Sequence, residues 1–247
     1  MVVESARTAP EFTDEELQRI NQRLEGSSPQ EVLRWALERF HPNVSLASSF
    51  GAEDVALIDM LVKLNPQARI FCLETGRLHQ ETYDVMDHVR NKYGISIEAY
   101  FPNTEATQSM VREHGLNLFY ESVDLRKMCC GVRKVEPLGR ALKGLDAWIT
   151  GLRRDQAATR VDVGKVERDA ANGGILKINA LADWTSEQVW AYIRENKVPY
   201  NTLHDRGFPS IGCEPCTRAV EPGEDPRAGR WWWEQEGGKK ECGLHVR

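Results

Sequence analysis

The chain has 247 residues, 41% hydrophobic and 28% charged, which is enough for one globular domain with a substantial core. Its formal net charge of −5 argues against nucleic acid as the main partner. No apolar run approaches the ~18–20 residues that cross a bilayer, and residues 1–12 are too polar for a secretory signal, so we expect a cytoplasmic protein with no membrane or nucleic-acid partner.

Two helices are predicted before residue 41. Thr13 to Glu16 form a capping box ahead of apolar residues at helical spacing. Ser28 caps a second helix, which has Pro29 at its first position. We expect both helices to pack on the body of the protein.

Strands and helices alternate from residue 43 onward. Short apolar runs predict strands over 44–48, 69–73, 95–100, 147–150 and 175–179. Amphipathic patterns predict helices up to residue 64, over 78–93 and 105–114, and from 185 to about 195. This alternation is typical of an α/β fold with a doubly wound, mostly parallel sheet, which binds ligands at the carboxyl ends of its strands. From about residue 199 the chain becomes rich in proline, glycine and charge, which predicts an irregular C-terminal tail.

Three predicted strand ends carry residues suited to a phosphate-type ligand. Residues 48–51 offer backbone N–H groups and two hydroxyls at a helix N-terminus. Residues 74–76 and 151–154 end two further strands, and a cation follows downstream. The candidate binding residues are Ser48, Ser49, Gly51, Thr75, Gly76, Gly151, Arg153 and Arg160.

The order of the predicted elements divides the chain into three parts. Residues 1–40 form an N-terminal helical segment packed on the body. Residues 41–200 form a nucleotide-binding α/β domain. Residues 201–247 form a C-terminal segment.

Four of the six cysteines fall in two short clusters. Cys129 and Cys130 are adjacent, and Cys213 and Cys216 have C-x-x-C spacing. In a reducing compartment such clusters indicate a metal site more than a disulfide framework, either zinc or an iron–sulfur cluster. Zinc ligands usually come from separated pairs, whereas a cubane binds each cysteine to a different iron, so we favour [4Fe-4S] and keep zinc as the alternative. Cys72 fits a small buried residue of a strand.

These motifs resemble the PAPS/APS reductase family over roughly residues 40–245. The loop Ser-Ser-Phe-Gly-Ala-Glu-Asp at 48–54 is similar to the family's modified PP-loop, and residues 73–76 are similar to its L-[DE]-T-G element. Residues 151–160 resemble its arginine-rich loop, and residues 240–245 its E-C-G-[LI]-H tail. The resemblance implies an adenine nucleotide alpha hydrolase-like fold of the PP-loop type. The four clustered cysteines make the chain most similar to the iron–sulfur assimilatory members.

The resemblance also implies an activity: thioredoxin-dependent reduction of adenosine 5'-phosphosulfate (APS) to sulfite and AMP in sulfate assimilation. Cys242 would attack the sulfur and hold it as S-sulfocysteine, and His245 would supply positive charge or hold the leaving phosphate. Arg227 and Arg230 would hold the sulfate and phosphate, and Lys134 would link the cluster and the substrate electrostatically. A homo-oligomer is also expected.

Three alternative functions remain open at this point. The first is a reductase that prefers or also accepts PAPS, the 3'-phosphorylated form of APS. The second is an iron–sulfur PP-loop enzyme of tRNA thiolation, although the chain has neither an S-G-G-x-D-S loop nor net positive charge. The third is a non-enzymatic zinc module. Glu74, where many relatives have aspartate, is a small departure from the family pattern.

Overall fold

Six strands of the computed structural model, which describes residues 12–156, 160–234 and 244, form one sheet in the order β3-β2-β1-β4-β6-β5. Neighbouring strands run parallel except β5 and β6, which run antiparallel. The predicted doubly wound, mostly parallel sheet is therefore confirmed. The strands are β1 (Val44–Ala47), β2 (Arg69–Leu73), β3 (Glu98–Tyr100), β4 (Ala147–Ile149), β5 (Val166–Asp169) and β6 (Ile175–Ile178).

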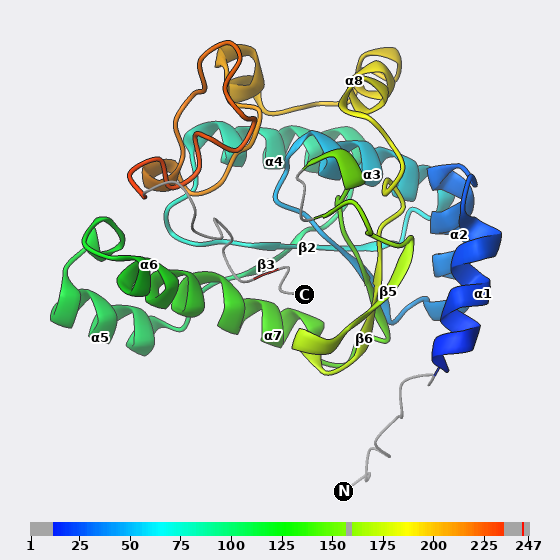
Figure 1. Ribbon diagram of the computed structural model, residues 1–247, viewed down its shortest axis with the longest axis horizontal. Helices are drawn as coiled ribbons and strands as arrows, with labels where there is room; N and C mark the ends of the chain where they lie inside the picture. The colour runs from blue at the N-terminus through cyan, green and yellow to red at the C-terminus, as the bar shows by residue number, and fades with distance from the viewer. Residues whose placement is uncertain (1–11, 157–159, 235–243, 245–247) are drawn as a thin grey trace, which may run out of the picture.

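Helices cover both faces of the sheet. Figure 1 shows α3 and α4 on one side of the strands and α5, α6 and α7 on the other. The main core lies where α2, α3 and α8 pack together on the first face, and a second cluster lies where α7 packs on β2 and β3. The helices are α1 (Asp14–Leu24), α2 (Pro29–Phe40), α3 (Ala52–Leu64), α4 (Gln80–Tyr93), α5 (Thr104–His114), α6 (Val123–Cys130), α7 (Glu136–Leu142) and α8 (Ser186–Glu195).

Helix α1 packs against the edge strand β5 of the sheet. Thr13 and Ser28 form the expected capping boxes. The Asn21 side-chain amide of α1 donates to the backbone oxygen of Val166 at 2.7 Å, and its oxygen accepts from the Val166 N–H at 3.0 Å. An edge strand otherwise presents unpaired backbone groups, so this contact protects β5.

Two parts of the chain were missed by the sequence patterns. The edge strand β5 carries three charged residues in four, which hides its alternation. Helices α6 and α7 were also missed, and a π-helix, η2 (Gly131–Val135), joins them. A π turn shifts the helical period, and Pro137 inside the segment resembles a helix breaker.

Residues 199–234 contain short 3₁₀ helices and turns, where the composition predicted irregular structure. These are η6 (Thr202–Arg206) and η7 (Glu214–Cys216), followed by an isolated bridge between Thr217 and Arg230. None of the helices in the described part of the chain is long and apolar enough to span a membrane.

Candidate functional site

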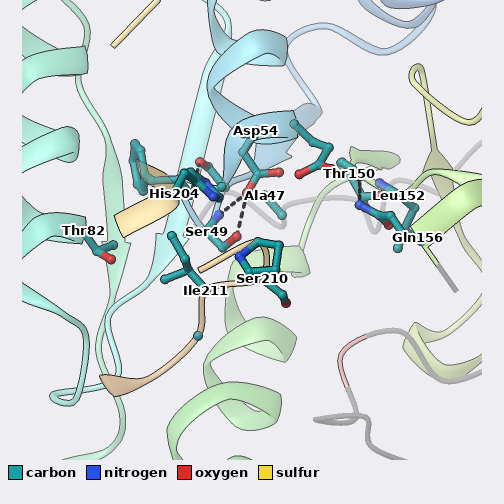
Figure 2. A pocket seen from close by; sticks show the side chains of 18 of the residues that line it. Ala47, Ser49, Asp54, Thr82, Thr150, Leu152, Gln156, His204, Ser210 and Ile211 are labelled. Carbon is teal, nitrogen blue, oxygen red and sulfur yellow. Dashed lines mark hydrogen bonds between the residues drawn. The ribbon is translucent and has the colours of Figure 1, made fainter. Parts of the chain in front are cut away.

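A cavity of about 1050 Å³ lies at the carboxyl ends of β1, β2 and β4, where a doubly wound sheet binds its ligands. Figure 2 shows Ser49 and Asp54 near its centre, with Thr150 and Gln156 to one side and Thr82 to the other. The volume suffices for a nucleotide. Ten of the residues predicted to bind the substrate line it: Ser48, Ser49, Gly51, Thr75, Lys134, Gly151, Arg153, Arg160, Arg227 and Arg230.

The turn from β1 into α3 is built around a buried carboxylate. The backbone N–H and the hydroxyl of Ser49 donate to Asp54 Oδ2 at 2.6 and 2.8 Å (Figure 2). Phe50, buried in the core, adopts a left-handed backbone conformation (φ 59°) that turns the chain into the helix. Burial raises the pKa of Asp54 to about 6. The two Ser49 donors that the sequence suggested for a ligand therefore bind the carboxyl group of Asp54 in the same loop.

Gly151 allows the turn after β4 to lie directly against α3. A Cβ atom at this position would lie 2.6 Å from Asp54 Oδ1 and 2.9 Å from Glu53 Cβ. Such distances require a shift of the helix or the turn, so only glycine fits the observed packing.

The arginines of the loop after β4 have different partners. Arg153 is buried, and its guanidinium donates to Glu53 Oε1 at 2.7 and 2.9 Å and pairs with Asp155. Arg154 Nη1 lies 2.7 Å from Glu25 Oε1, and neither of these residues lines the cavity. Arg160 lines the cavity and donates to the Gln156 side chain. The charge of Arg153 is thus balanced by carboxylates of the cavity wall itself.

Cations from the last quarter of the chain form another part of the wall. Arg230 is buried, lies 4.9 Å above the Trp231 ring and donates to Ser210 Oγ at 3.2 Å. Gly212 makes room for it, because a Cβ there would lie 2.3 Å from Arg230 Nη2. Arg227 lines the same cavity. These side chains give this end of the cavity an anion-binding character.

The turn after β2 connects the cavity to the cysteines. The Thr75 hydroxyl lies 3.4 Å from Cys213 Sγ, and the Thr75 carbonyl accepts from Arg133 Nη1 at 2.6 Å. Gly76 has a left-handed backbone (φ 68°) and is not among the residues that line the cavity. Lys134 and Cys213 line both this cavity and the small one described next. They therefore form a shared wall.

All four clustered cysteines are buried and line one small cavity. Burial raises the pKa of Cys129, and it raises that of Cys216 to about 12. Four cations line the same cavity and would balance the negative charge of thiolates bound to iron. They are Arg77, Arg126, Arg133 and Lys134.

In the described part of the chain, no three cysteine, histidine or acidic side chains stand in the geometry that holds one metal ion. Thiolates are ligands of both zinc and iron–sulfur clusters, and the four cysteines are the donors that this cavity would offer. Cys72 is buried and its pKa is raised to about 12, so it suits the structural role expected for it.

Comparison with known proteins identifies the family. Residues 43–219 match the model of the phosphoadenosine phosphosulfate reductase domain. The chain belongs to the phosphoadenosine phosphosulfate reductase family. The crystal structure of phosphoadenylyl-sulfate (PAPS) reductase from Candida auris, a phosphate complex, is similar to this structure, with a TM-score of 0.75 and 35% sequence identity. The similarity covers 86% of this chain and 100% of that chain.

Other members of the family are more similar in sequence. The adenosine 5'-phosphosulfate reductase of Burkholderia cepacia is 55% identical over 206 residues, which are 83% of this chain and 82% of the relative. The chloroplastic 5'-adenylylsulfate reductase 3 of Arabidopsis thaliana is 48% identical over 239 residues, which are 94% of this chain and 51% of the relative. FMN adenylyltransferase from Candida glabrata shares the fold alone, at 12% identity and a TM-score of 0.55.

Some residues of this family member were not assigned a role from the sequence. Asp54 stood inside the quoted loop, but nothing in the sequence showed that its carboxylate turns back onto Ser49. Arg133 stood beside Lys134, and its contact with Thr75 depends on the fold. For Arg126, the only feature of the sequence that points to the cysteine site is its position four residues before Cys130. The predicted residues Cys242 and His245 lie outside the described residues.

Proposed function

We propose that this protein reduces adenosine 5'-phosphosulfate to sulfite and AMP, with thioredoxin as the electron donor, in sulfate assimilation. Two relatives more than 50% identical carry the name adenosine 5'-phosphosulfate reductase. The observation that carries the proposal is the cavity itself. Strand-end loops and the cations Lys134, Arg227 and Arg230 line one space, as a phosphosulfate nucleotide requires.

Cys242 is the proposed nucleophile. Its thiolate attacks the sulfuryl sulfur, an S–S bond forms, and the bond from sulfur to the phosphate oxygen breaks with release of AMP. Arg227, Arg230 and Lys134 stabilise the negative charge of the sulfate and of the departing phosphate, with His245 as a further cation. Leu244 lines the cavity only two positions after Cys242 in the chain, which supports this assignment.

An external dithiol completes the turnover. One thiolate of the donor attacks Cys242 Sγ and releases sulfite, and the second resolves the mixed disulfide, which leaves an oxidised donor and a free Cys242. A small dithiol protein such as thioredoxin supplies both thiols.

A [4Fe-4S] cluster is proposed on Cys129, Cys130, Cys213 and Cys216. When bound, it would supply a fixed local charge next to the substrate and clamp residues 129–134 to 213–216. The chain's own contribution is the shared wall, where Lys134 faces both the cysteines and the substrate cavity. We further propose a homo-oligomer in the cytoplasm that binds no nucleic acid.

The mass of the protein tests the nucleophile. Anaerobically purified protein is mixed with APS in the absence of thioredoxin and weighed under denaturing conditions. We expect a sulfonate adduct that maps to Cys242. Cys242→Ser should keep its iron and bind AMP, yet form no adduct and release no sulfite. Sulfite release by that variant would contradict the assignment.

PAPS is the second candidate substrate, since the Candida auris neighbour is named a PAPS reductase. The same experiment with PAPS separates the two. An adduct with PAPS and none with APS would move the assignment to PAPS reduction, and no adduct with either would refute both.

The ligand set is tested by Cys213→Ser. This variant should lose the visible absorption of the cluster, most of its iron and its activity, because a cubane with three protein ligands is labile. Cys72→Ser is the matched control and should retain iron. Unchanged iron in Cys213→Ser would show that the proposed ligands are wrong.

A further inference from the structure

Arg133 brings a buried positive charge to the cavity of the four cysteines. It lies in the π-helix η2, between α6 and α7 (Figure 1), and is 8% exposed. It lines the cysteine cavity, yet it is not among the residues that line the substrate cavity. Its charge therefore acts at the cysteines and makes no direct contact in the substrate cavity.

The partners of Arg133 differ from those of two other buried arginines. Arg126 pairs with Glu234 at 2.7 Å, and Arg153 pairs with Glu53 at 2.7 Å. Arg133 Nη1 instead donates to a neutral group, the Thr75 carbonyl oxygen, at 2.6 Å. Among the described residues, no carboxylate forms an ion pair with Arg133. Burial of a charge is costly unless an opposite charge balances it, so this guanidinium is suited to an anionic group in the cysteine cavity.

Arg133 also connects the two pairs of cysteines. Burial raises the pKa of Cys129, and the charge of Arg133 together with a hydrogen bond from its side chain opposes that rise. The Thr75 carbonyl accepts from Arg133, and the Thr75 hydroxyl lies 3.4 Å from Cys213 Sγ. One guanidinium thus contacts a cysteine of the first pair directly and a cysteine of the second pair through Thr75.

The turn after β2 is shaped to admit this guanidinium. Gly76 has a left-handed backbone, and a Cβ atom there would lie 3.2 Å from Arg133 Nη1. A side chain at this position would therefore press on the guanidinium.

We propose that Arg133 is the counter-ion of the metal–thiolate centre: its guanidinium balances the negative charge of the cysteine thiolates and holds the Thr75 turn beside them. This inference rests on the metal centre proposed above and adds a residue to it. A thiol gives up its proton when it binds a metal, and a cation beside it stabilises the thiolate. An arginine side chain stays protonated in proteins, so this compensation does not depend on pH.

The first test is the rate at which a chelator removes iron from the anaerobically purified protein, followed by visible absorption and metal analysis. Arg133→Met keeps an unbranched side chain but no charge, and it should lose iron about 10- to 100-fold faster than wild type. It should still bind AMP as tightly as wild type, since Arg133 does not line the substrate cavity. Equal losses of AMP affinity and of iron would mean a general loss of fold and would overturn the proposal.

Arg133→Lys separates the charge from the packing. It keeps a cation at the cysteines, so it should retain iron much better than Arg133→Met. It also keeps the proposal testable should Arg133→Met fail to fold. Iron loss from Arg133→Lys as fast as from Cys213→Ser would overturn the role of the charge.

Lys165→Met is the matched control. Lys165 is fully buried, pairs with Asp183 at 2.8 Å and lines neither cavity. Its loss should lower the melting temperature yet leave iron loss below that temperature unchanged. Iron loss at the wild-type rate from Arg133→Met would overturn the proposal. So would equal acceleration in Lys165→Met, since general destabilisation would then explain the effect.

These measurements need no APS, so they separate the counter-ion from the proposed reaction. If wild type contains zinc, the same rates are measured for zinc. Faster zinc loss from Arg133→Met would then support the counter-ion, while the [4Fe-4S] assignment fails. Wild type that binds neither metal would overturn both. If metal loss follows the expected order yet APS forms no adduct on Cys242, the counter-ion stands and the proposed nucleophile fails.

Discussion

Asp54 shows how a single residue sets the character of the loop after β1. Its carboxyl group is buried and accepts both donors of Ser49, with Glu53 next to it in the chain. Loss of hydration disfavours the ionised form more than these hydrogen bonds favour it, so the pKa rises to about 6. The group therefore changes charge within a pH range in which the protein can be studied.

Asp54→Asn should reveal this titration through stability. The folded-state pKa of about 6 lies above the reference value of 3.8. The stabilising contribution is thus fully present below about pH 3.8 and is lost as the pH rises through about 6. Relative to Asp54→Asn, which keeps the acceptor oxygen but cannot ionise, wild type should lose about 1 kcal/mol between pH 5 and pH 7.5.

The difference in melting temperature between the two proteins, scanned at the same rate, measures this effect. It should shift by about 2–4 °C between the two pH values. A difference that does not change with pH would mean that Asp54 does not titrate in this range.

At the scale of elements, the site depends on how closely the turn after β4 approaches α3. The absence of a side chain at Gly151 lets the two meet, so the strand-end loops of β1 and β4 line one cavity. The position of the helix and the shape of the cavity are therefore linked.

Gly151→Ala should separate these elements. The added methyl group collides with Asp54 and Glu53, and relief of the collision should cost about 1–3 kcal/mol of stability and weaken AMP binding at least 10-fold. Isothermal titration with AMP and a thermal melt check both. Gly139→Ala in α7 is the control: its Cβ would meet nothing within 4 Å, so it should be neutral or slightly stabilising. Wild-type AMP affinity in Gly151→Ala would contradict the link.

Elements with strong local signals were predictable from the sequence, and those without were not. Capping residues placed the starts of α1, α2 and α8 correctly, and β2 matches its predicted range. The edge strand β5 escaped because its residues are mostly charged and its partner β6 lies on one side only. The segment from α6 to α7 escaped because its period changes within the π turn.

At the scale of the whole molecule, one buried ion pair joins distant parts of the chain. Arg126 and Glu234 are 108 residues apart, and their pair ties the helix that carries the adjacent cysteines to the end of the body. Removal of one partner would leave a buried charge without compensation.

Glu234→Gln should therefore destabilise the protein by about 3–5 kcal/mol. Glu136→Gln breaks the Arg140–Glu136 pair, whose side chains are each 46% exposed, and should cost at most about 0.5 kcal/mol. Melting temperatures of the two variants against wild type give the comparison. Equal shifts would show that burial does not set the value of the first pair.

The candidate site was predictable at the strand ends and unpredictable wherever distant residues meet. Parallel strands bring their carboxyl ends to one edge, so Ser48, Thr75 and Gly151 could be grouped from the sequence. No local pattern shows that Arg153 pairs with Glu53, 100 residues earlier. Such pairings depend on the sheet order, which only the folded chain displays.

The π turn between α6 and α7 sets the direction in which the side chains of α6 point relative to those of α7. The Glu136 N–H donates to the Gly131 oxygen, five residues back. An α-helical hydrogen bond spans four residues, so the π turn contains one extra residue. Loss of that surplus residue would leave a regular α-helix but rotate everything before it by ~100° relative to α7. Cys129 and Cys130 would then point away from Cys213 and Cys216. A descendant could thus keep all four cysteines and still lose their meeting point through a single-codon deletion.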